Sequence, residues 1–406
     1  MSKSFNIILF AVSGLVGLLV FIAAALFLFY DINAYKPQME AVASSALGME
    51  VRVGGRLGIG FFPGLLVTLE DVHIRNRGAD VASAKEARLG IDLLPLLQKQ
   101  VRIGKIALKH PRISIEQDRD GKFNFEKPEE ARATFPALDL AKVSLSDGTL
   151  LYTDKQSGEG FEAVNCNLGV RRLRLAEGKS SDLLKYLSFT AELACGEIRK
   201  NDFTVSDLKF SADGKNGVFD LKPVTMRVFG AQGSGSIQAD FSGAVPRYHV
   251  RYSLSQFHIE EFFKTLSPQK VAEGPMDFSA NLSMQGKTVN EMRQTVAGQI
   301  SLRGENLTLN GSDLDREFSR FESSQNFNLV DAGAFFFAGP FGLVVTKGYN
   351  FASIFQGSGG RSEIRTLVSD WKVERGVAQA QDVAMATNQN RVALQGELDF
   401  VNEQFN

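Results

Sequence analysis

From residue 49 onward, apolar and polar side chains alternate in short runs, and this period of two constrains the fold more than any other feature of the sequence. Successive side chains of a strand point to opposite faces of a sheet, so each run predicts a strand with one apolar and one polar face. The apolar positions of the clearest runs are Ala87, Leu89, Ile91 and Leu93; Val164, Cys166, Leu168 and Val170; Phe189, Ala191, Leu193 and Cys195; Val250, Tyr252 and Leu254; Phe278, Ala280, Leu282 and Met284; and Leu307 and Leu309.

Turn signals separate these runs and predict how the strands pair. The dipeptides Asp120-Gly121, Asp147-Gly148 and Asp213-Gly214 are typical of tight β-hairpins. Tight turns favour antiparallel pairing, because parallel strands need long crossover connections. At about a dozen residues per strand and turn, the chain has room for more than about twenty strands, which would extend for about 100 Å side by side.

The apolar face of so long a sheet must be covered, and the alternation leaves three solutions open. A second sheet covers it in a sandwich, and a closed barrel turns it inward. A curled, open trough leaves it lining a hollow. Open sheets of this size rarely stay flat, so curling is expected in any case.

Before these runs, residues 4–30 contain no charged side chain. A helix over residues 7–30 would be about 36 Å long, enough to cross a bilayer. A cleaved signal peptide is the alternative, but the apolar run continues well past the small residues Ala23, Ala24 and Ala25. Lys3 before the span and Asp31 after it place residues 1–6 in the cytoplasm and the rest of the chain outside it.

Helical signals are few after the span. A juxtamembrane helix is expected over residues 31–48, with Pro37 in its first turn and Gly48 at its exit. Short helices are predicted over 94–100, 259–266 and 312–323. Residues 127–137 are the best boundary between an N-terminal β region, 49–130, and a continuing β region, 138–406.

Composition excludes several functions. The 45 Lys and Arg nearly balance the 46 Asp and Glu, so no global field would hold nucleic acid. The two Cys and four His lack metal-ligand spacing, and no nucleophile lies in a catalytic motif, so we expect no metal, no cofactor and no enzyme. The 32 Phe, against one Trp and seven Tyr, must be buried or kept for an apolar ligand.

Cys166 and Cys195 share the parity of the apolar residues in their runs, so both should face the apolar side. They could form a disulfide in an oxidising compartment if their strands are neighbours. Buried free thiols are the alternative, and the one we favour from the sequence.

Several motifs, in order, resemble the AsmA family. They begin directly after the span with Asp31-Ile32-Asn33-Ala34-Tyr35-Lys36-Pro37 and continue with Leu57-Gly58-Ile59-Gly60-Phe61-Phe62-Pro63-Gly64-Leu65. Ile91-Asp92-Leu93-Leu94-Pro95-Leu96-Leu97 and Asp118-Arg119-Asp120-Gly121-Lys122-Phe123-Asn124-Phe125 follow, and Asp370-Trp371-Lys372-Val373 through Gly396-Glu397-Leu398-Asp399-Phe400 is similar to the family's closing region.

This resemblance implies a fold and a function. It implies a mostly β protein: an N-terminal transmembrane helix, then a long, curled antiparallel sheet with an open apolar groove and a few short helices. The chain would be anchored in the inner membrane, with its bulk in the periplasm. It would carry phospholipid toward the outer membrane, with the acyl chains, the inner membrane and an outer-membrane or periplasmic protein as partners.

An alternative function is a scaffold that assembles outer-membrane proteins through an exposed sheet edge.

If the protein carries lipid, residues of the alternating runs are the candidates for contact with it. The candidate groove residues are Val164, Cys166, Leu168, Val170, Phe189, Ala191, Leu193, Phe278, Leu282, Met284, Leu307 and Leu309.

Overall fold

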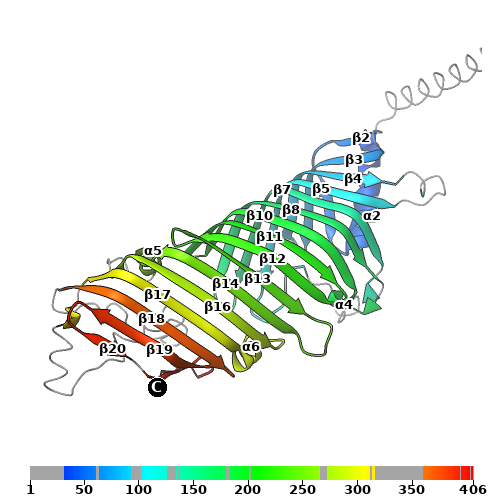
Figure 1. Ribbon diagram of the computed structural model, residues 1–406. Helices are drawn as coiled ribbons and strands as arrows, with labels where there is room; N and C mark the ends of the chain where they lie inside the picture. The colour runs from blue at the N-terminus through cyan, green and yellow to red at the C-terminus, as the bar shows by residue number, and fades with distance from the viewer. Residues whose placement is uncertain are drawn as a thin grey trace, which may run out of the picture.

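One long sheet dominates the computed structural model (Figure 1). The structure describes residues 32–60, 64–92, 95, 102–125, 134–135, 137–176, 178–179, 183–200, 203–265, 272–310, 313–315, 360–393, 395–402 and 404–405. The predicted tail 1–6, the predicted anchor 7–30 and most of the predicted helices 94–100 and 312–323 lie outside these residues. Within the described residues, no helix has the length and apolar character needed to cross a bilayer.

Fourteen long strands form the body of the sheet, and short strands extend it at both ends. The long ones are β3 (Leu65–Asn76), β4 (Ala79–Ile91), β5 (Ile103–Gln117), β7 (Leu138–Asp154), β8 (Gly160–Leu175), β10 (Leu187–Lys200), β11 (Phe203–Lys215), β12 (Val218–Val228), β13 (Ala231–Asp240), β14 (Arg247–His258), β16 (Pro275–Gln285), β17 (Ala297–Asn310), β18 (Arg361–Glu374) and β19 (Val377–Thr387).

The short strands do not lengthen the sheet in proportion to their number. β1 (Glu50–Val53) and β2 (Leu57–Gly60) both pair with β3, and β20 (Arg391–Ala393) and β21 (Glu397–Asp399) both pair with β19. β15 (Ala272–Glu273) pairs with β17 and β22 (Gln404–Phe405) with β21, while β6 (Thr134–Phe135) and β9 (Gly178–Lys179) form a separate pair. With one short strand beyond β3 and two beyond β19, seventeen described strands lie side by side and span about 77 Å, less than the expected 100 Å.

Each long strand pairs with the next along the chain, and the pairing is antiparallel, as the turn signals predict, at every junction but one. β5 and β7 are parallel, with Ile106 beside Val143, so no hairpin joins these two strands. The predicted Asp120-Gly121 turn follows β5 and brings Phe123 back to an antiparallel bridge with Gln117. In this turn the Asp118 carboxylate accepts hydrogen bonds from the backbone N–H groups of Asp120 and Lys122. Antiparallel pairing is therefore wrong at this junction.

Four hairpins use two-residue turns with positive φ at both positions, the geometry that matches strand twist. These turns are Arg77-Gly78, Asn216-Gly217, Phe229-Gly230 and Arg375-Gly376. Asp213-Gly214 lies inside β11, so the predicted turn there is misplaced by three residues. A Cβ at Gly214 would collide with the rings of Phe189 and Phe219, so this glycine makes room for aromatic packing.

A line of β-bulges crosses the sheet from β3 to β17. Each of seven strands contributes one polar residue with positive φ to this line, and β8 has a second such residue, Arg172, outside it. Side chains accept hydrogen bonds from backbone N–H groups at the bulges: the Asn167 amide oxygen, for example, accepts from the Asp147 N–H at 3.2 Å. Bulges bend a strand and increase its twist, so this line curves the sheet. The seven residues are Asp71, His110, Asp147, Asn165, Asp207, Gln256 and Asn306.

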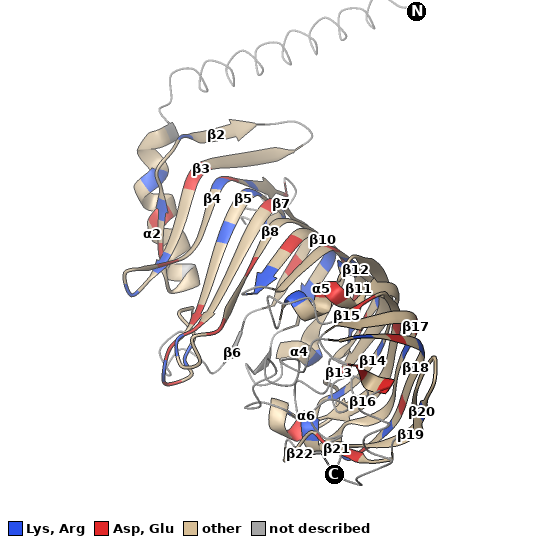
Figure 2. Cartoon of the chain, turned by 90° about the vertical axis from the view of Figure 1, so that its left-hand side faces the viewer, with Lys and Arg blue, Asp and Glu red and all other residues tan. Residues whose placement is uncertain are grey.

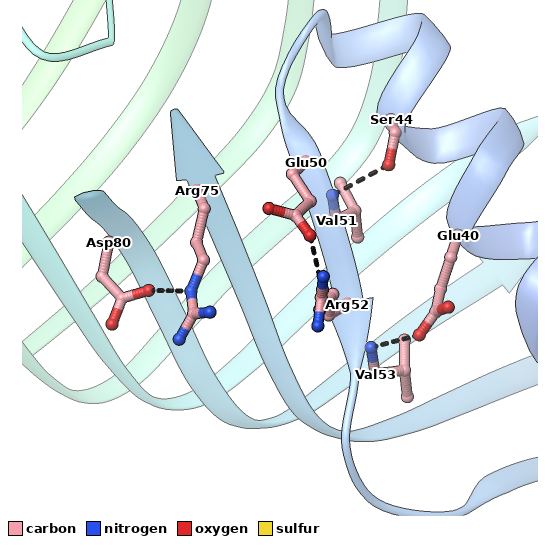
Figure 3. Close-up of polar contacts among 8 residues, drawn as sticks. All are labelled: Glu40, Ser44, Glu50, Val51, Arg52, Val53, Arg75 and Asp80. Carbon is pink, nitrogen blue, oxygen red and sulfur yellow. Dashed lines mark hydrogen bonds and ion pairs between the residues drawn. The ribbon is translucent and has the colours of Figure 1, made fainter. Parts of the chain in front are cut away.

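A helix closes the N-terminal edge of the sheet (Figure 3). The 3₁₀ turn η1 (Ile32–Tyr35) leads into α2 (Lys36–Leu47), within the range 31–48 expected for a helix. Ser44 Oγ accepts from the Val51 N–H at 2.8 Å and Glu40 Oε1 from the Val53 N–H at 2.7 Å, while Asn33 Oδ1 accepts from the Leu57 N–H at 3.0 Å. These N–H groups are thus not free to pair with another strand.

Three further short helices lie at the strand ends. Figure 1 shows α4 (Leu183–Tyr186) and α6 (Val289–Thr295) along one long side of the sheet and α5 (Ile259–Lys264) along the other. In Figure 2 the strands from β10 to β20 curl through an arc with α5 on its inner side. Ile259, Phe262 and Phe263 of α5 pack against the apolar face, which is therefore the inner face.

Candidate functional site

Two unbroken rows of paired apolar residues run along the inner face of the sheet, and we call them together the apolar strip. Directly paired residues share a face, so each row follows from the strand register alone. One row is Leu69, Ala87, Leu108, Leu145, Leu168, Leu193, Phe210, Val224, Gly235, Tyr252, Ala280, Ile300, Trp371 and Ala380; the other is Val67, Leu89, Ile106, Val143, Val170, Ala191, Ala212, Leu221, Ile237, Val250, Leu282, Gly298, Val373 and Ala378.

The opposite face of the same strands is polar. One row there passes from Lys209 in β11 to Asp370 in β18 through hydroxyl side chains alone: Thr225, Ser234, Ser253, Ser279 and Ser301. A hollow of about 490 Å³ opens mainly among side chains of this polar face, including Asn167, Glu192, Lys209 and Ser211. The sheet thus separates a water-facing side from an apolar side along its whole length.

Burial divides the apolar strip into a partly exposed middle and two covered ends. From β4 to β16 its bulky members other than Val224, such as Ile106, Val170 and Leu282, are only half-buried. At the N-terminal end Ala43 of α2 packs over Val51, Val53 and Val72. At the C-terminal end Ile364, Leu367 and Val373 are at most 1% exposed, in a cluster that includes α5, Leu314 and Phe400.

Most of the predicted groove residues lie on this inner face. Ala191 is buried. The half-buried ones in the middle of the sheet are Cys166, Leu168, Val170, Phe189, Leu193, Phe278, Leu282 and Met284.

Leu307 and Leu309 differ from the half-buried candidates, because they are 1% and 2% exposed inside the C-terminal cluster. The covering helix α5 comes from a different part of the chain. The alternation of the β17 residues therefore carried no sign of it.

Val164 lies on the opposite face. It pairs with Glu197, whereas its neighbour Ala163, 3% exposed, pairs with Ile198 on the inner face. The bulge at Asn165, with φ of 54°, shifts the phase of the alternation between Cys166 and Val164. Placing Val164 with the inward residues is therefore wrong.

Cys166 and Cys195 form a disulfide across β8 and β10, with Cα atoms 4.0 Å apart. The register places Cys166 opposite Cys195, because Asn167 pairs with Ala194 on one side and Val164 with Glu197 on the other. Favouring free thiols was therefore wrong. The sequence left it open whether the two runs are neighbours, and the register decides it.

An aromatic ladder, which the alternation did not reveal, follows the edge of the inner face that carries α4. Phe189 stacks on Phe219 with ring centroids 5.8 Å apart. Phe219 meets Phe241 at 5.7 Å, and Phe241 meets Tyr248 at 5.8 Å. The ladder joins β10, β12 and β14, so it adds aromatic surface beside the middle of the apolar strip.

Tyr252 brings a polar atom into the apolar strip. A Cβ at Gly233 would collide with its hydroxyl, and one at Gly235 would lie 2.9 Å from its ring, so the Gly-Ser-Gly segment of β13 makes room for this side chain. These glycines thus lie inside a strand, β13. The hydroxyl is buried without a hydrogen-bond partner, and burial raises the pKa of Tyr252 to about 12.

This pKa predicts a loss of stability in base. An unfolded tyrosine loses its proton near pH 10, whereas folded Tyr252 keeps it up to about pH 12. Between these values the unfolded chain binds fewer protons, so the free energy of unfolding falls as pH rises, and below about pH 10 this group contributes no slope. Tyr252→Phe should therefore flatten the decline measured by urea unfolding between about pH 10 and 12. An unchanged slope would show that the hydroxyl is solvated.

Within the described residues, no group of three His, Cys, Asp or Glu side chains is placed to hold a metal ion. The ionisable groups instead form exposed pairs on the polar face and at strand ends, such as Arg75 with Asp80 at 2.6 Å (Figure 3). Exposed pairs of this kind contribute little to stability. The distinctive feature of the described surface is thus the apolar strip.

Comparison with known proteins assigns the family. A sequence model described as "AsmA family" matches residues 1–183 and 187–326, which is most of the chain. The match stops before residues 370–400, where the sequence also resembles the family's closing region. No curated protein matches the chain significantly. The family match, together with a large open β-sheet and few short helices, identifies this chain as a member of the AsmA family.

Proposed function

We propose that this protein binds phospholipid in a groove formed by the apolar strip and carries it between the inner and outer membranes, supporting outer-membrane biogenesis. The observation that supports this most is the continuity of the strip: from β3 to β19, every residue of its two rows is apolar or glycine, and only Tyr252 and Trp371 add a polar atom. Acyl chains need no special contact, because burial of apolar surface is non-directional.

The exposure of the strip also fits a ligand. Bulky side chains such as Leu168, Leu193 and Phe210 remain half-buried in the middle of the sheet, although the chain covers the same face at both ends. Large contiguous apolar surfaces in contact with water usually mark binding sites. No catalytic role is part of this proposal. A membrane anchor over residues 7–30 would hold the groove at the inner membrane, with the sheet in the periplasm.

Assembly of outer-membrane proteins through a sheet edge is the alternative function. Such pairing needs free backbone donors at an edge. At the N-terminal edge Ser44 and Glu40 accept from the N–H groups of Val51 and Val53. This edge therefore cannot serve that role without displacement of α2.

Photo-crosslinking tests the proposal. A photoreactive amino acid at Leu168, Leu193 or Leu282 should capture phospholipid in cells, because these side chains line the partly exposed strip. The same amino acid at Ala194, next to Leu193 but on the polar face, is the matched control. Leu309, 2% exposed, should also remain unlabelled. Equal labelling at Leu193 and Ala194 would refute a groove on one face of the sheet.

A further inference from the structure

An exposed surface at the α4 side of the sheet combines apolar and basic side chains, and we call it the α4 patch. Leu138 at the start of β7 is 42% exposed, and in α4 Leu183, Leu184 and Tyr186 are 37%, 39% and 45% exposed. The Ala176 N–H donates to the Tyr186 carbonyl at 3.3 Å, which holds α4 against the end of β8. Four large apolar side chains gathered at one place mark an interaction surface more often than scattered ones do.

The α4 patch is continuous with the apolar strip. Leu138 pairs with Leu175, which pairs in turn with Leu187. Leu140, only 5% exposed, pairs with Leu173 and lies between this edge and the Val143–Val170 pair of the strip. Apolar pairs thus lead from the end of β7, beside α4, toward the Val143–Val170 pair of the strip.

Basic residues border the α4 patch. Lys142 lies between Lys105 and Arg171 on the polar face, so three cations stand side by side. Asp139 lies 3.2 Å from Arg102 and 3.7 Å from Arg174, and Glu192 lies 3.6 Å from Arg171. Among the described residues near the patch, the basic side chains exceed the acidic ones: Arg102, Lys105, Lys142, Arg171, Arg172, Arg174 and Lys185 against Asp92, Asp139, Glu192 and Asp213.

Both ends of the apolar strip are covered, which favours entry of a ligand across a long side of the sheet. Ala43 of α2 packs over the N-terminal end, and the cluster around Phe263 of α5 covers the C-terminal end. A ligand therefore reaches the half-buried middle across one of the two long sides of the sheet. The α4 patch is on one of these sides, next to Val143 and Val170.

We propose that the α4 patch is the portal through which an anionic phospholipid, presented at a bilayer surface, enters and leaves the groove. Its negatively charged headgroup is bound near the end of β8 by Arg172 and Arg174, because guanidinium groups form strong, charge-assisted hydrogen bonds with phosphate. Its acyl chains pass over Leu183 and Leu184 to the strip. This inference rests on the proposed function, which it extends by naming the lipid class and the place of entry.

The test measures the rate at which full-length protein takes up photoreactive phospholipid from vesicles, read by crosslinking at position 193. Vesicles consist of phosphatidylcholine with or without phosphatidylglycerol. The variant carries Arg172→Ser and Arg174→Ser. The matched control carries Arg199→Ser and Lys200→Ser, basic residues at the opposite end of β10 with side chains 55% and 46% exposed.

The variant lowers the positive charge of the α4 patch, so uptake of photoreactive phosphatidylglycerol should slow at least about tenfold. Phosphatidylcholine carries a phosphate but no net charge, so its uptake should slow much less, and the control variant should stay near wild type with both lipids. Added salt should slow the wild type and leave the variant nearly unchanged. A portal sets the rate and not the final occupancy, so both proteins should reach the same labelling after long incubation.

Equal uptake by the variant and the wild type would overturn the portal and would favour an acidic protein as the partner of the α4 patch. Equal slowing with both vesicle types would overturn it as well. Absence of labelling at position 193 in every protein would instead reject the proposed function itself. Unfolding curves of the variant, followed by Trp371 fluorescence, separate a local effect from misfolding.

Discussion

Leu193→Asp is expected to abolish lipid binding without unfolding the protein. Leu193 pairs with Leu168 and Phe210, so the new carboxylate would stand in the middle of the apolar strip. Lost contact with two or three acyl methylenes costs about 2 kcal/mol, and desolvation of the carboxylate adds about 1–3 kcal/mol. Phospholipid recovered with the purified protein, measured by mass spectrometry, should therefore fall by more than about tenfold.

The position next to Leu193 supplies the control. Ala194→Asp adds the same charge to the same strand, but on the polar face between Asn167 and Lys209. It should leave lipid recovery unchanged. Because the strip is half-buried at Leu193, the aspartate stays hydrated in the lipid-free protein and lowers stability only slightly. If Leu193→Asp retains lipid while Ala194→Asp loses it, the faces are assigned wrongly.

The same pair of variants separates the two candidate functions. A role in outer-membrane assembly through a sheet edge needs backbone groups, which neither substitution touches. Cells that depend on this protein for lipid transport should lose barrier function with Leu193→Asp and keep it with Ala194→Asp. Full function with Leu193→Asp would favour the edge-pairing alternative.

Phe263→Ala is expected to destabilise the protein by about 3–5 kcal/mol, the range for a buried phenylalanine. Phe263 is 2% exposed in α5, and its ring meets that of Phe262 with centroids 5.7 Å apart. Its removal leaves a cavity over the C-terminal part of the strip. Denaturant unfolding measures the loss, followed by the fluorescence of Trp371, the single Trp of the chain.

Trp371 reports on the same cluster, because it is 4% exposed and donates to Ser369 Oγ at 2.7 Å. Leu168→Ala is the comparison, since its half-buried side chain leaves little cavity and should cost only about 1 kcal/mol. Similar losses for both variants would mean that the middle of the strip is packed as tightly as its end, which would leave no room for a ligand.

The alternation predicted the strands and most of the inner face from residues alone. Leu168, Leu193 and Leu282 fall on that face because cross-strand partners share it and each strand keeps a period of two. The mostly β fold is confirmed for the same reason, and the family match confirms the resemblance seen in the ordered motifs. These properties are local, or repeat at short range along the chain.

Where a strand changes its phase, the local pattern misled. Asp147-Gly148 has the composition of a hairpin turn but forms a bulge inside β7, because an aspartate with φ of 53° suits either. The bulge at Asn165 placed Val164 on the polar face in the same way. A polar residue with left-handed propensity between two alternating runs of opposite phase would have indicated both.

The sequence by itself therefore determined that this chain forms strands with one apolar side, because side-chain direction along a strand depends only on neighbouring residues. Only the tertiary structure decided that Cys166 meets Cys195, that β5 lies parallel to β7, and that α5 covers Leu309 but not Leu168. Each of these depends on which distant segments come together. Segments far apart in sequence leave no periodic trace in one another.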